Sequence, residues 1–281
     1  MPRIPAPSSA PGGKLRKRII SGVLFAALIV AGIFVNPFTV LLITLALSLL
    51  CLSEFFRLFP VTKFFRVVAM MLTILLFMLV GLLTWFGSTG PHIPIWFPLV
   101  SLLFFHVFGH IAGESPGANN SMKRQTGILF IGFLWISQML ALSVFIRAHE
   151  NGAWWLFFVV AVTAACDTGA YFIGKKWGRH PLAPRISPGK TVEGVVGGLI
   201  CAIIAALLIG NFLNLKIPVR IFLGAVLAVA AILGDLFESG LKRKSGVKDS
   251  GTLIPGHGGL LDRLDSHLFT LPTLFIYLLF S

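Results

Sequence analysis

Nine long apolar runs dominate this sequence, and they constrain its fold more than any single motif does. A bilayer core takes about 20 apolar residues of helix to cross, and most of these runs approach that length. The chain is 56% hydrophobic and 12% charged, which is more apolar surface than a soluble core of this size can bury. The sequence therefore predicts an all-α polytopic integral membrane protein with about nine transmembrane helices. We expect them near residues 18–35, 38–53, 66–87, 95–112, 127–146, 153–174, 191–213, 219–237 and 261–280.

The runs divide the chain into three parts. Residues 1–17 are basic and rich in proline, and we expect them to be disordered because nothing there can bury a face. Residues 18–150 are expected to form the N-terminal transmembrane helices, and residues 151–281 a C-terminal transmembrane region with two long polar loops. We interpret 18–35 as a retained helix and not a signal peptide, since further spans follow and no convincing small-residue cleavage site is present.

Positive charge is unevenly distributed between the loops. With nine spans, the N-terminus and every even-numbered loop lie on the same side of the membrane. Of the 23 Lys and Arg residues, only Arg147, Lys216 and Arg220 lie on the opposite side. Under the positive-inside rule the basic side is cytoplasmic, so we expect a cytoplasmic N-terminus and a bacterial-type inner membrane. The net charge of +13 then reflects topology. No basic groove interleaved with aromatic residues is visible, and no nucleic-acid partner is expected.

The few acidic residues gather in the C-terminal part. Seven of the ten lie between residues 167 and 265, close to the predicted cytoplasmic ends of the helices. Asp167 is expected roughly 10 Å inside its helix, where an unpaired carboxylate costs about 2.5–3.5 kcal/mol. A structural ion pair with a loop cation would satisfy such a group, and so would a functional cluster. The convergence of several carboxylates favours the functional cluster.

Helical spacing groups these acids with other polar residues. One predicted helix carries Asp235, Glu238, Ser239 and Lys242 at positions i, i+3, i+4 and i+7. The next predicted helix carries Asp262, Asp265 and Ser266 at positions i, i+3 and i+4. Such positions share a helix face. Carboxylates among Lys and Arg suit a polyphosphate bound with magnesium. The three cysteines lie in apolar segments without zinc or disulfide spacing, so neither kind of site is expected.

Two loops hold the motifs. In the first, the segment 187–191 reads Ser-Pro-Gly-Lys-Thr and resembles the end of a P-loop, but the upstream glycine is replaced by Pro184 and no strand is expected before it. A Walker-type ATPase is therefore disfavoured. A turn presenting Lys190 at a helix start would favour an anion, and ordinary helix capping explains the motif equally well. The second loop, 234–266, contains glycines that permit close backbone approach to a ligand.

The second loop resembles that of the phosphatidate cytidylyltransferases, also called CDP-diacylglycerol synthases. The resemblance is carried by Ser239, Lys-Arg at 242–243, Lys-Asp at 248–249, Pro-Gly-His-Gly-Gly at 255–259 and Leu-Asp-Arg-Leu-Asp at 261–265. The first loop is similar to the family's as well, so the resemblance covers roughly residues 160–270. It implies transfer of CMP from CTP to phosphatidic acid, giving CDP-diacylglycerol and pyrophosphate for phospholipid biosynthesis. Residues 151–281 would then be the catalytic region.

The resemblance and the residue chemistry together assign expected roles. We expect catalytic roles for Asp235, Asp262, Lys242, Arg243, Lys248, Asp249 and Arg263. We expect substrate phosphates to bind at Ser187, Lys190, Thr191, Ser239, Gly256, His257, Gly258 and Gly259. A magnesium ion is expected on Asp235 and Asp262, with Asp167, Glu193, Glu238 and Asp265 as further candidates and the number of cations left open. For His257, contact with phosphate and a hydrogen bond to the backbone remain equal alternatives.

Two other functions are alternatives to transfer of CMP to phosphatidic acid. A related nucleotidyltransferase could use another lipid phosphate as acceptor. A membrane transporter would need charges near the bilayer midplane and internal repeats, whereas the acids here lie near one face and no repeat is found. The expected partners are CTP and phosphatidic acid, and a homodimer is compatible with the sequence. A further stripe, His106, His110 and Glu114, has the spacing for an ion site or for hydrogen bonds between helices.

Overall fold

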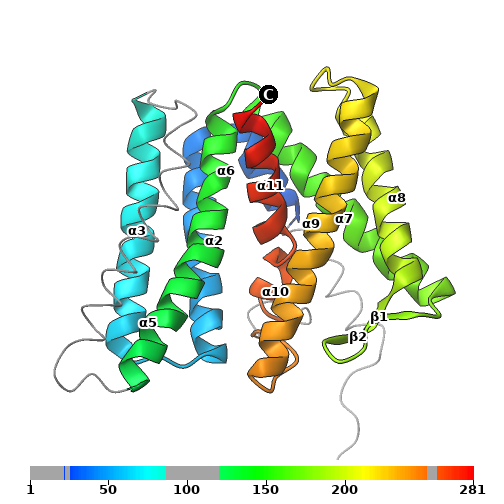
Figure 1. The fold of residues 1–281 in the computed structure, drawn as a ribbon. Helices are drawn as coiled ribbons and strands as arrows, with labels where there is room; N and C mark the ends of the chain where they lie inside the picture. The colour runs from blue at the N-terminus through cyan, green and yellow to red at the C-terminus, as the bar shows by residue number, and fades with distance from the viewer. Residues whose placement is uncertain (1–21, 23–25, 87–119, 252–257) are drawn as a thin grey trace, which may run out of the picture.

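The computed structural model describes residues 22, 26–86, 120–251 and 258–281, which form a bundle of roughly aligned helices (Figure 1). A short helix, Ala26–Val35, comes first. The π-helical segment η1 (Phe133–Gln138) connects α5 to α6, and the strands β1 (Pro181–Ala183) and β2 (Ser187–Thr191) form an antiparallel hairpin. The helices are α2 (Pro37–Leu58), α3 (Lys63–Trp85), α5 (Asn120–Gly132), α6 (Met139–Ala148), α7 (Gly152–Trp177), α8 (Val192–Ile209), α9 (Ile217–Lys244), α10 (Leu261–Leu264) and α11 (His267–Leu279).

Among these described residues, six helical segments are long and apolar enough to cross a membrane. They are Pro37–Leu58, Lys63–Trp85, Ser121–Ala148, Gly152–Trp177, Val192–Ile209 and Ile217–Lys244. They confirm six of the expected spans and identify an integral membrane protein that is all-α apart from the β1–β2 hairpin. The expected span 95–112 lies outside the described residues, and 18–35 is described mainly from residue 26 onward. The nine-helix count and the sidedness stay predictions.

The last expected span, 261–280, is divided in the structure. A short helix, α10, is followed by Asp265 and Ser266 and then by α11, so no single helix of span length covers this segment. Both intervening residues keep right-handed helical backbone angles. The segment therefore passes from α10 into α11 with helical backbone angles, with α10 in the lower half of the bundle and the C-terminus at the top (Figure 1).

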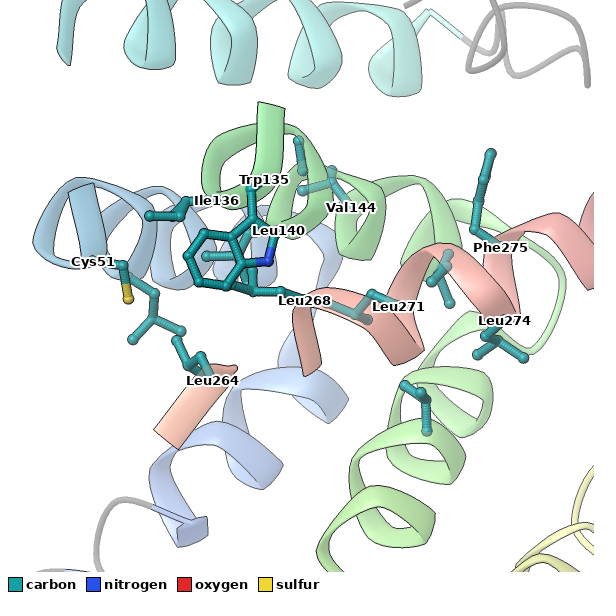
Figure 2. Packing of buried hydrophobic residues seen from close by; sticks show 14 of the residues in the cluster. Cys51, Trp135, Ile136, Leu140, Val144, Leu264, Leu268, Leu271, Leu274 and Phe275 are labelled. Carbon is teal, nitrogen blue, oxygen red and sulfur yellow. The ribbon is translucent and has the colours of Figure 1, made fainter. Parts of the chain in front are cut away.

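Buried apolar side chains hold α11 between the two halves of the chain. Leu268, Leu271 and Leu274 of α11 pack among residues of α2, η1, α6 and α7, including Trp135 and Cys51 (Figure 2). Aromatic contacts extend this core, since the Trp135 ring lies 6.2 Å from Phe55 and 5.0 Å from Phe237, centroid to centroid. Such edge-to-face pairs add to the energy of burial. All three cysteines are free, and Cys51 is fully buried.

Small residues let α7 and α8 approach closely. A Cβ at Gly169 would collide with the side chain of Cys201 and with the carbonyl oxygen of Gly197. Small residues of this kind allow close backbone contact between helices in membranes. The tight α7–α8 pair fixes the position of the hairpin between the two helices, and with it the position of Lys190.

The hairpin corrects two expectations about the first loop. Ser187–Thr191 is a strand and not a turn, because it pairs with β1 in the register Ala183 to Ser187 and Pro181 to Thr191. A strand also precedes the motif, contrary to expectation, although it is the antiparallel partner in a two-stranded sheet and not the strand of a P-loop unit. The expected helix start is confirmed, since the Thr191 side chain caps α8 by accepting the Gly194 N–H at 3.1 Å.

Candidate active site

A cavity of about 530 Å³ opens among α7, β2, α8, α9 and α10, a volume typical of ligand sites. Residues from both motif loops line it, so segments that are distant in the sequence meet here. Its charged lining residues are Asp167, Lys175, Lys190, Asp235, Lys242, Asp262, Arg263 and Asp265. The polar cavity thus mixes carboxylates with cations, as the spacing of the motifs predicted.

Asp262 is the most heavily bonded carboxylate of the polar cavity. Its Oδ1 accepts a hydrogen bond from Lys242 Nζ at 2.8 Å, and its Oδ2 accepts the Gly259 N–H at 2.8 Å. The Ser250 N–H donates to both oxygens at 3.2 and 3.1 Å. Gly258 adopts a positive φ of 86°, and a Cβ there would press on Asp262 Oδ2. This backbone position requires glycine, because it lets the chain wrap closely around the carboxylate.

Lys242 lies between two carboxylates. Its Nζ is 2.6 Å from Glu238 Oε2, one helical turn earlier on α9, and 2.8 Å from Asp262 Oδ1. The Glu238 side chain is 0% exposed, so its charge depends on Lys242 for compensation. Glu238 is not part of the cavity lining, and it reaches the polar cavity through Lys242 and through a side-chain contact with Asp262. The arrangement holds the ammonium group at the cavity wall.

Asp235 forms the more open part of the polar cavity. Its Oδ2 lies 2.7 Å from Lys190 Nζ, an ion pair that connects β2 to α9. The Ser239 hydroxyl donates to its Oδ1 at 3.4 Å. The Asp235 side chain is 36% exposed, compared with 10% for Asp262. Asp235 therefore has more room to exchange its present partner for a ligand.

The remaining two acids line the polar cavity between α7 and α11. Asp167 Oδ1 accepts a hydrogen bond from the Ser266 hydroxyl at 3.4 Å. Asp265 is 7% exposed, and its Oδ1 accepts the N–H of Ser266 at 2.8 Å. Both carboxylates reach the polar cavity as the sequence predicted, and Ser266 connects them.

Glu54 of α2 supports the site from outside the cavity, and the sequence analysis gave it no role. It is fully buried, and its Oε2 accepts the Leu261 N–H at 2.8 Å and the Ser250 hydroxyl at 3.2 Å. These donors flank the segment that carries the glycine motif, so Glu54 holds both ends of that segment. The sequence feature that could have identified Glu54 is its position as a single acidic residue in an apolar helix. A carboxylate in such a helix is energetically costly and usually has a functional role.

Several predicted residues lie outside the polar cavity lining. Arg243 donates from Nε to the Ile186 carbonyl at 3.1 Å and from Nη1 to the Val247 carbonyl at 3.4 Å, contacts that connect the hairpin to the end of α9. Lys248 and Asp249 are exposed on the segment after α9, and Ser187 lies in β2. Their expected roles in catalysis and binding stay predictions.

Glu193 contacts the short segment between α7 and β1 and is absent from the cavity lining. It accepts the N–H groups of Arg179 and His180 at 3.0 and 3.2 Å, and its Oε1 lies 2.5 Å from His180 Nδ1. Its expected role as a metal ligand stays a prediction. Gly256 and His257 lie outside the described residues, as do His106, His110 and Glu114.

The carboxylates of the polar cavity offer oxygen donors of the kind that a magnesium ion would need. In the described part of the chain, no group of three or more His, Cys, Asp or Glu side chains is arranged to hold a metal unaided. Mg²⁺ usually takes one or two carboxylates and completes its shell with phosphates and water. Asp235 and Asp262 provide oxygen donors of this kind from neighbouring helices.

Comparison with known proteins identifies a family for this chain. A model of the cytidylyltransferase family matches residues 16–281. A phosphatidate cytidylyltransferase of Staphylococcus aureus is 46% identical over 139 residues, which cover 49% of this chain and 54% of that relative. One from Staphylococcus haemolyticus is 45% identical over 137 residues, covering 48% and 53%. One from Mycobacterium bovis is 35% identical over 194 residues, covering 66% and 63%. The chain thus spans about half the length of the staphylococcal relatives it matches.

Proposed function

Because this chain belongs to the cytidylyltransferase family, we propose that it transfers CMP from CTP to phosphatidic acid, yielding CDP-diacylglycerol and pyrophosphate for phospholipid biosynthesis. The relatives named phosphatidate cytidylyltransferase support this reaction. The observation that carries the proposal is the polar cavity, where four carboxylates and four cations meet among apolar helices. Such a cavity suits a reaction between a polyanionic nucleotide and a membrane lipid.

The reaction needs charge neutralisation more than proton transfer. An oxygen of the lipid phosphate attacks the α-phosphorus of CTP, and the bond from that phosphorus to the oxygen of the β-phosphate breaks. Pyrophosphate then leaves with the electron pair of the broken bond. A phosphomonoester with a second pKa of about 6 is already anionic at neutral pH, so the nucleophile requires no strong base. The main barrier is the approach of two polyanions.

Cationic residues of this chain lower the repulsion between the two polyanions. Lys190, Lys242 and Arg263 line the polar cavity and bring positive charge to the phosphates. Glu238 and Asp262 hold Lys242 in place before substrate arrives, which avoids reorganisation during the reaction. Asp235 does the same for Lys190. A magnesium ion on Asp235 and Asp262 would supply further charge stabilisation to the phosphates.

An activity assay tests this proposal. Purified protein in detergent is given radiolabelled CTP and phosphatidate, with magnesium varied and a polyprenyl monophosphate as an alternative acceptor. We expect a labelled CMP-lipid that depends on phosphatidate and on magnesium. Absence of labelled lipid with phosphatidate would refute the proposal, and preference for the polyprenyl acceptor would redirect it to a related nucleotidyltransferase.

We further propose that the polar cavity opens to the cytoplasm of a bacterial-type cell, with the N-terminus on the same side of the inner membrane. The distribution of Lys and Arg supports this orientation. Val247 and Lys216 flank opposite ends of α9, whose 28 residues span about 42 Å. In a cysteine-free background, Val247→Cys should react with a membrane-impermeant thiol reagent only from the cytoplasmic side, and Lys216→Cys only from outside. The reverse pattern would invert the topology.

CTP and phosphatidic acid are the proposed partners in this reaction. A homodimer also stays a prediction. Native mass spectrometry of the protein released from detergent would measure its oligomeric state, and a purely monomeric spectrum would contradict the dimer.

A further inference from the structure

A second cavity, of about 330 Å³, lies beside the polar one and differs from it in chemistry. Helix Ala26–Val35, α2, α6, α7 and α11 enclose it, and its lining is mostly aliphatic, including Ile33, Leu47, Leu140, Val160 and Leu271. Figure 2 shows Leu140 of α6 and Leu271 of α11 within this part of the core. This apolar cavity lies among apolar helices of the bundle.

The polar groups deep in the apolar cavity already have partners. The Thr44 hydroxyl donates to the Val40 carbonyl at 2.7 Å, and the Ser143 hydroxyl donates to the Leu140 carbonyl at 2.6 Å. Because both hydroxyls bond to their own helices, they leave the interior of the cavity to aliphatic surface. Such a cavity selects for an apolar ligand.

Arg263 lines both cavities and is the residue that the two linings share. Its neighbour Asp262 lines the polar cavity and its other neighbour, Leu264, lines the apolar one. The boundary between nucleotide chemistry and apolar surface therefore falls at this arginine. A guanidinium group at such a boundary matches a phosphate that carries an apolar chain.

A stripe of side chains continues the boundary into the apolar cavity. Arg263, His267 and Leu271 are spaced at i, i+4 and i+8, and all three line the apolar cavity. The helical backbone angles at Asp265 and Ser266 keep them on one face. His267 Nδ1 is buried and has no hydrogen-bond partner among the described residues. Moving away from the polar cavity, the stripe thus presents a cation, an imidazole ring and a hydrocarbon side chain.

The same order of groups occurs in a phosphatidate molecule, which has a phosphate, then glycerol ester carbonyls, then acyl chains. We propose that the apolar cavity holds one acyl chain of the lipid substrate, with its phosphate beside Arg263 and an ester carbonyl accepting a hydrogen bond from His267. This inference rests on the proposed function. Leu271 lies eight residues beyond Arg263, so the stripe follows the lipid for about 12 Å.

The apolar cavity orients the lipid more than it strengthens binding. An acyl chain in the bilayer is already surrounded by hydrocarbon, so moving it into protein gains little from the hydrophobic effect. Holding the chain instead fixes the phosphate against Arg263 at the edge of the polar cavity. Fixed geometry of this kind speeds a reaction between two bound substrates. Filling the cavity should therefore reduce turnover of long-chain lipids more than that of short-chain ones.

A cavity-filling variant tests this inference. Val160→Phe places a ring in the apolar cavity, and Val229→Phe is the matched control, because Val229 is 52% exposed on α9 and outside both linings. The measured quantity is the ratio of kcat/KM for dioleoyl phosphatidate to that for dihexanoyl phosphatidate. We expect Val160→Phe to lower this ratio by about tenfold, a size typical of hydrophobic-pocket discrimination, with the KM for CTP unchanged. Val229→Phe should leave the ratio at its wild-type value.

Binding measured without catalysis separates this inference from the proposed function. Native mass spectrometry should show dioleoyl phosphatidate retained by the wild type and retained to a smaller extent by Val160→Phe, because the ring occupies the space of the acyl chain. Retention of that kind without any CMP transfer would refute the proposed function and leave the acyl site standing. CMP transfer with an unchanged chain-length ratio in Val160→Phe would refute the acyl site. If that variant does not fold, the smaller change Ala164→Val, also in the lining, is measured in the same way.

Discussion

The two halves of the chain each bury a carboxylate near the site, and the two carboxylates have different partners. Glu54, from the N-terminal half, accepts hydrogen bonds from a backbone N–H and a hydroxyl. Glu238, from the C-terminal half, faces the ammonium group of Lys242. Both side chains are fully buried. Glu54 therefore holds the shape of the motif segment, whereas Glu238 holds a positive charge at the cavity wall.

This contrast suggests that the N-terminal half supports the site and the C-terminal half supplies its chemistry. Residues of α7, β2, α8, α9 and α10 line the polar cavity, and none of α2, α3, α5 or α6 does so in the part of the chain that is described. The N-terminal helices act through Glu54 and through the apolar cavity. Variants in each half should then change different kinetic quantities.

The largest expected effect is from Asp262→Asn. The substitution removes a charge that Lys242 and the backbone around Gly259 both contact, and it removes a predicted magnesium ligand. We expect a loss of about 10²- to 10³-fold in kcat in the CTP and phosphatidate assay. The exposed Glu150→Gln serves as the control and should keep wild-type activity. Wild-type kcat in Asp262→Asn would refute the assignment of Asp262 as a magnesium ligand.

Replacing Lys242 should affect both stability and activity. Lys242→Met leaves Glu238 buried without its cation, a change that typically costs about 3–5 kcal/mol. The double variant Lys242→Met/Glu238→Gln removes both charges, so it should recover most of the thermal stability lost in the single variant. Activity should stay about 10²-fold low in both, since the cation at the phosphates is missing. Recovery of activity together with stability would mean that Lys242 has only a structural role.

Glu54 should produce a smaller effect of a different kind. Glu54→Leu leaves the Leu261 N–H and the Ser250 hydroxyl without their acceptor, at about 1–3 kcal/mol for each buried group. We expect kcat to fall by about tenfold while the KM for CTP stays constant. Glu54→Gln retains an oxygen acceptor and should restore part of kcat. A change in KM without a change in kcat would place Glu54 in substrate binding and break the contrast between the halves.

The smallest effect is expected from Glu193→Gln. Its carboxylate bonds to Arg179 and His180, between α7 and β1, and lies outside the polar cavity lining. An amide oxygen can replace part of this bonding, so kcat and its magnesium dependence should stay within about threefold of wild type. A shift in the magnesium concentration needed for activity would restore the role predicted from the sequence, that of a metal ligand.

The sequence by itself determined the helical architecture and the main acids of the site. Backbone groups in hydrocarbon must bond within their own segment, so long apolar runs become helices wherever they occur. This is why the expected and observed bounds of α2, α3 and α7 differ by only a few residues. The face shared by Asp235, Glu238 and Lys242 also followed from the sequence, because residues on one helix have fixed relative positions.

Only the tertiary structure decided which distant groups meet. The pairing of Lys190 with Asp235 depends on the β1–β2 hairpin and on how closely α7 and α8 pack. The contact of Glu54 with Leu261 joins residues 207 positions apart. Hydropathy and spacing report local periodicity, whereas such contacts depend on how whole helices pack against each other. For the same reason, the position of Arg263 between a polar and an apolar cavity became visible only once α10 and α11 were placed in the bundle.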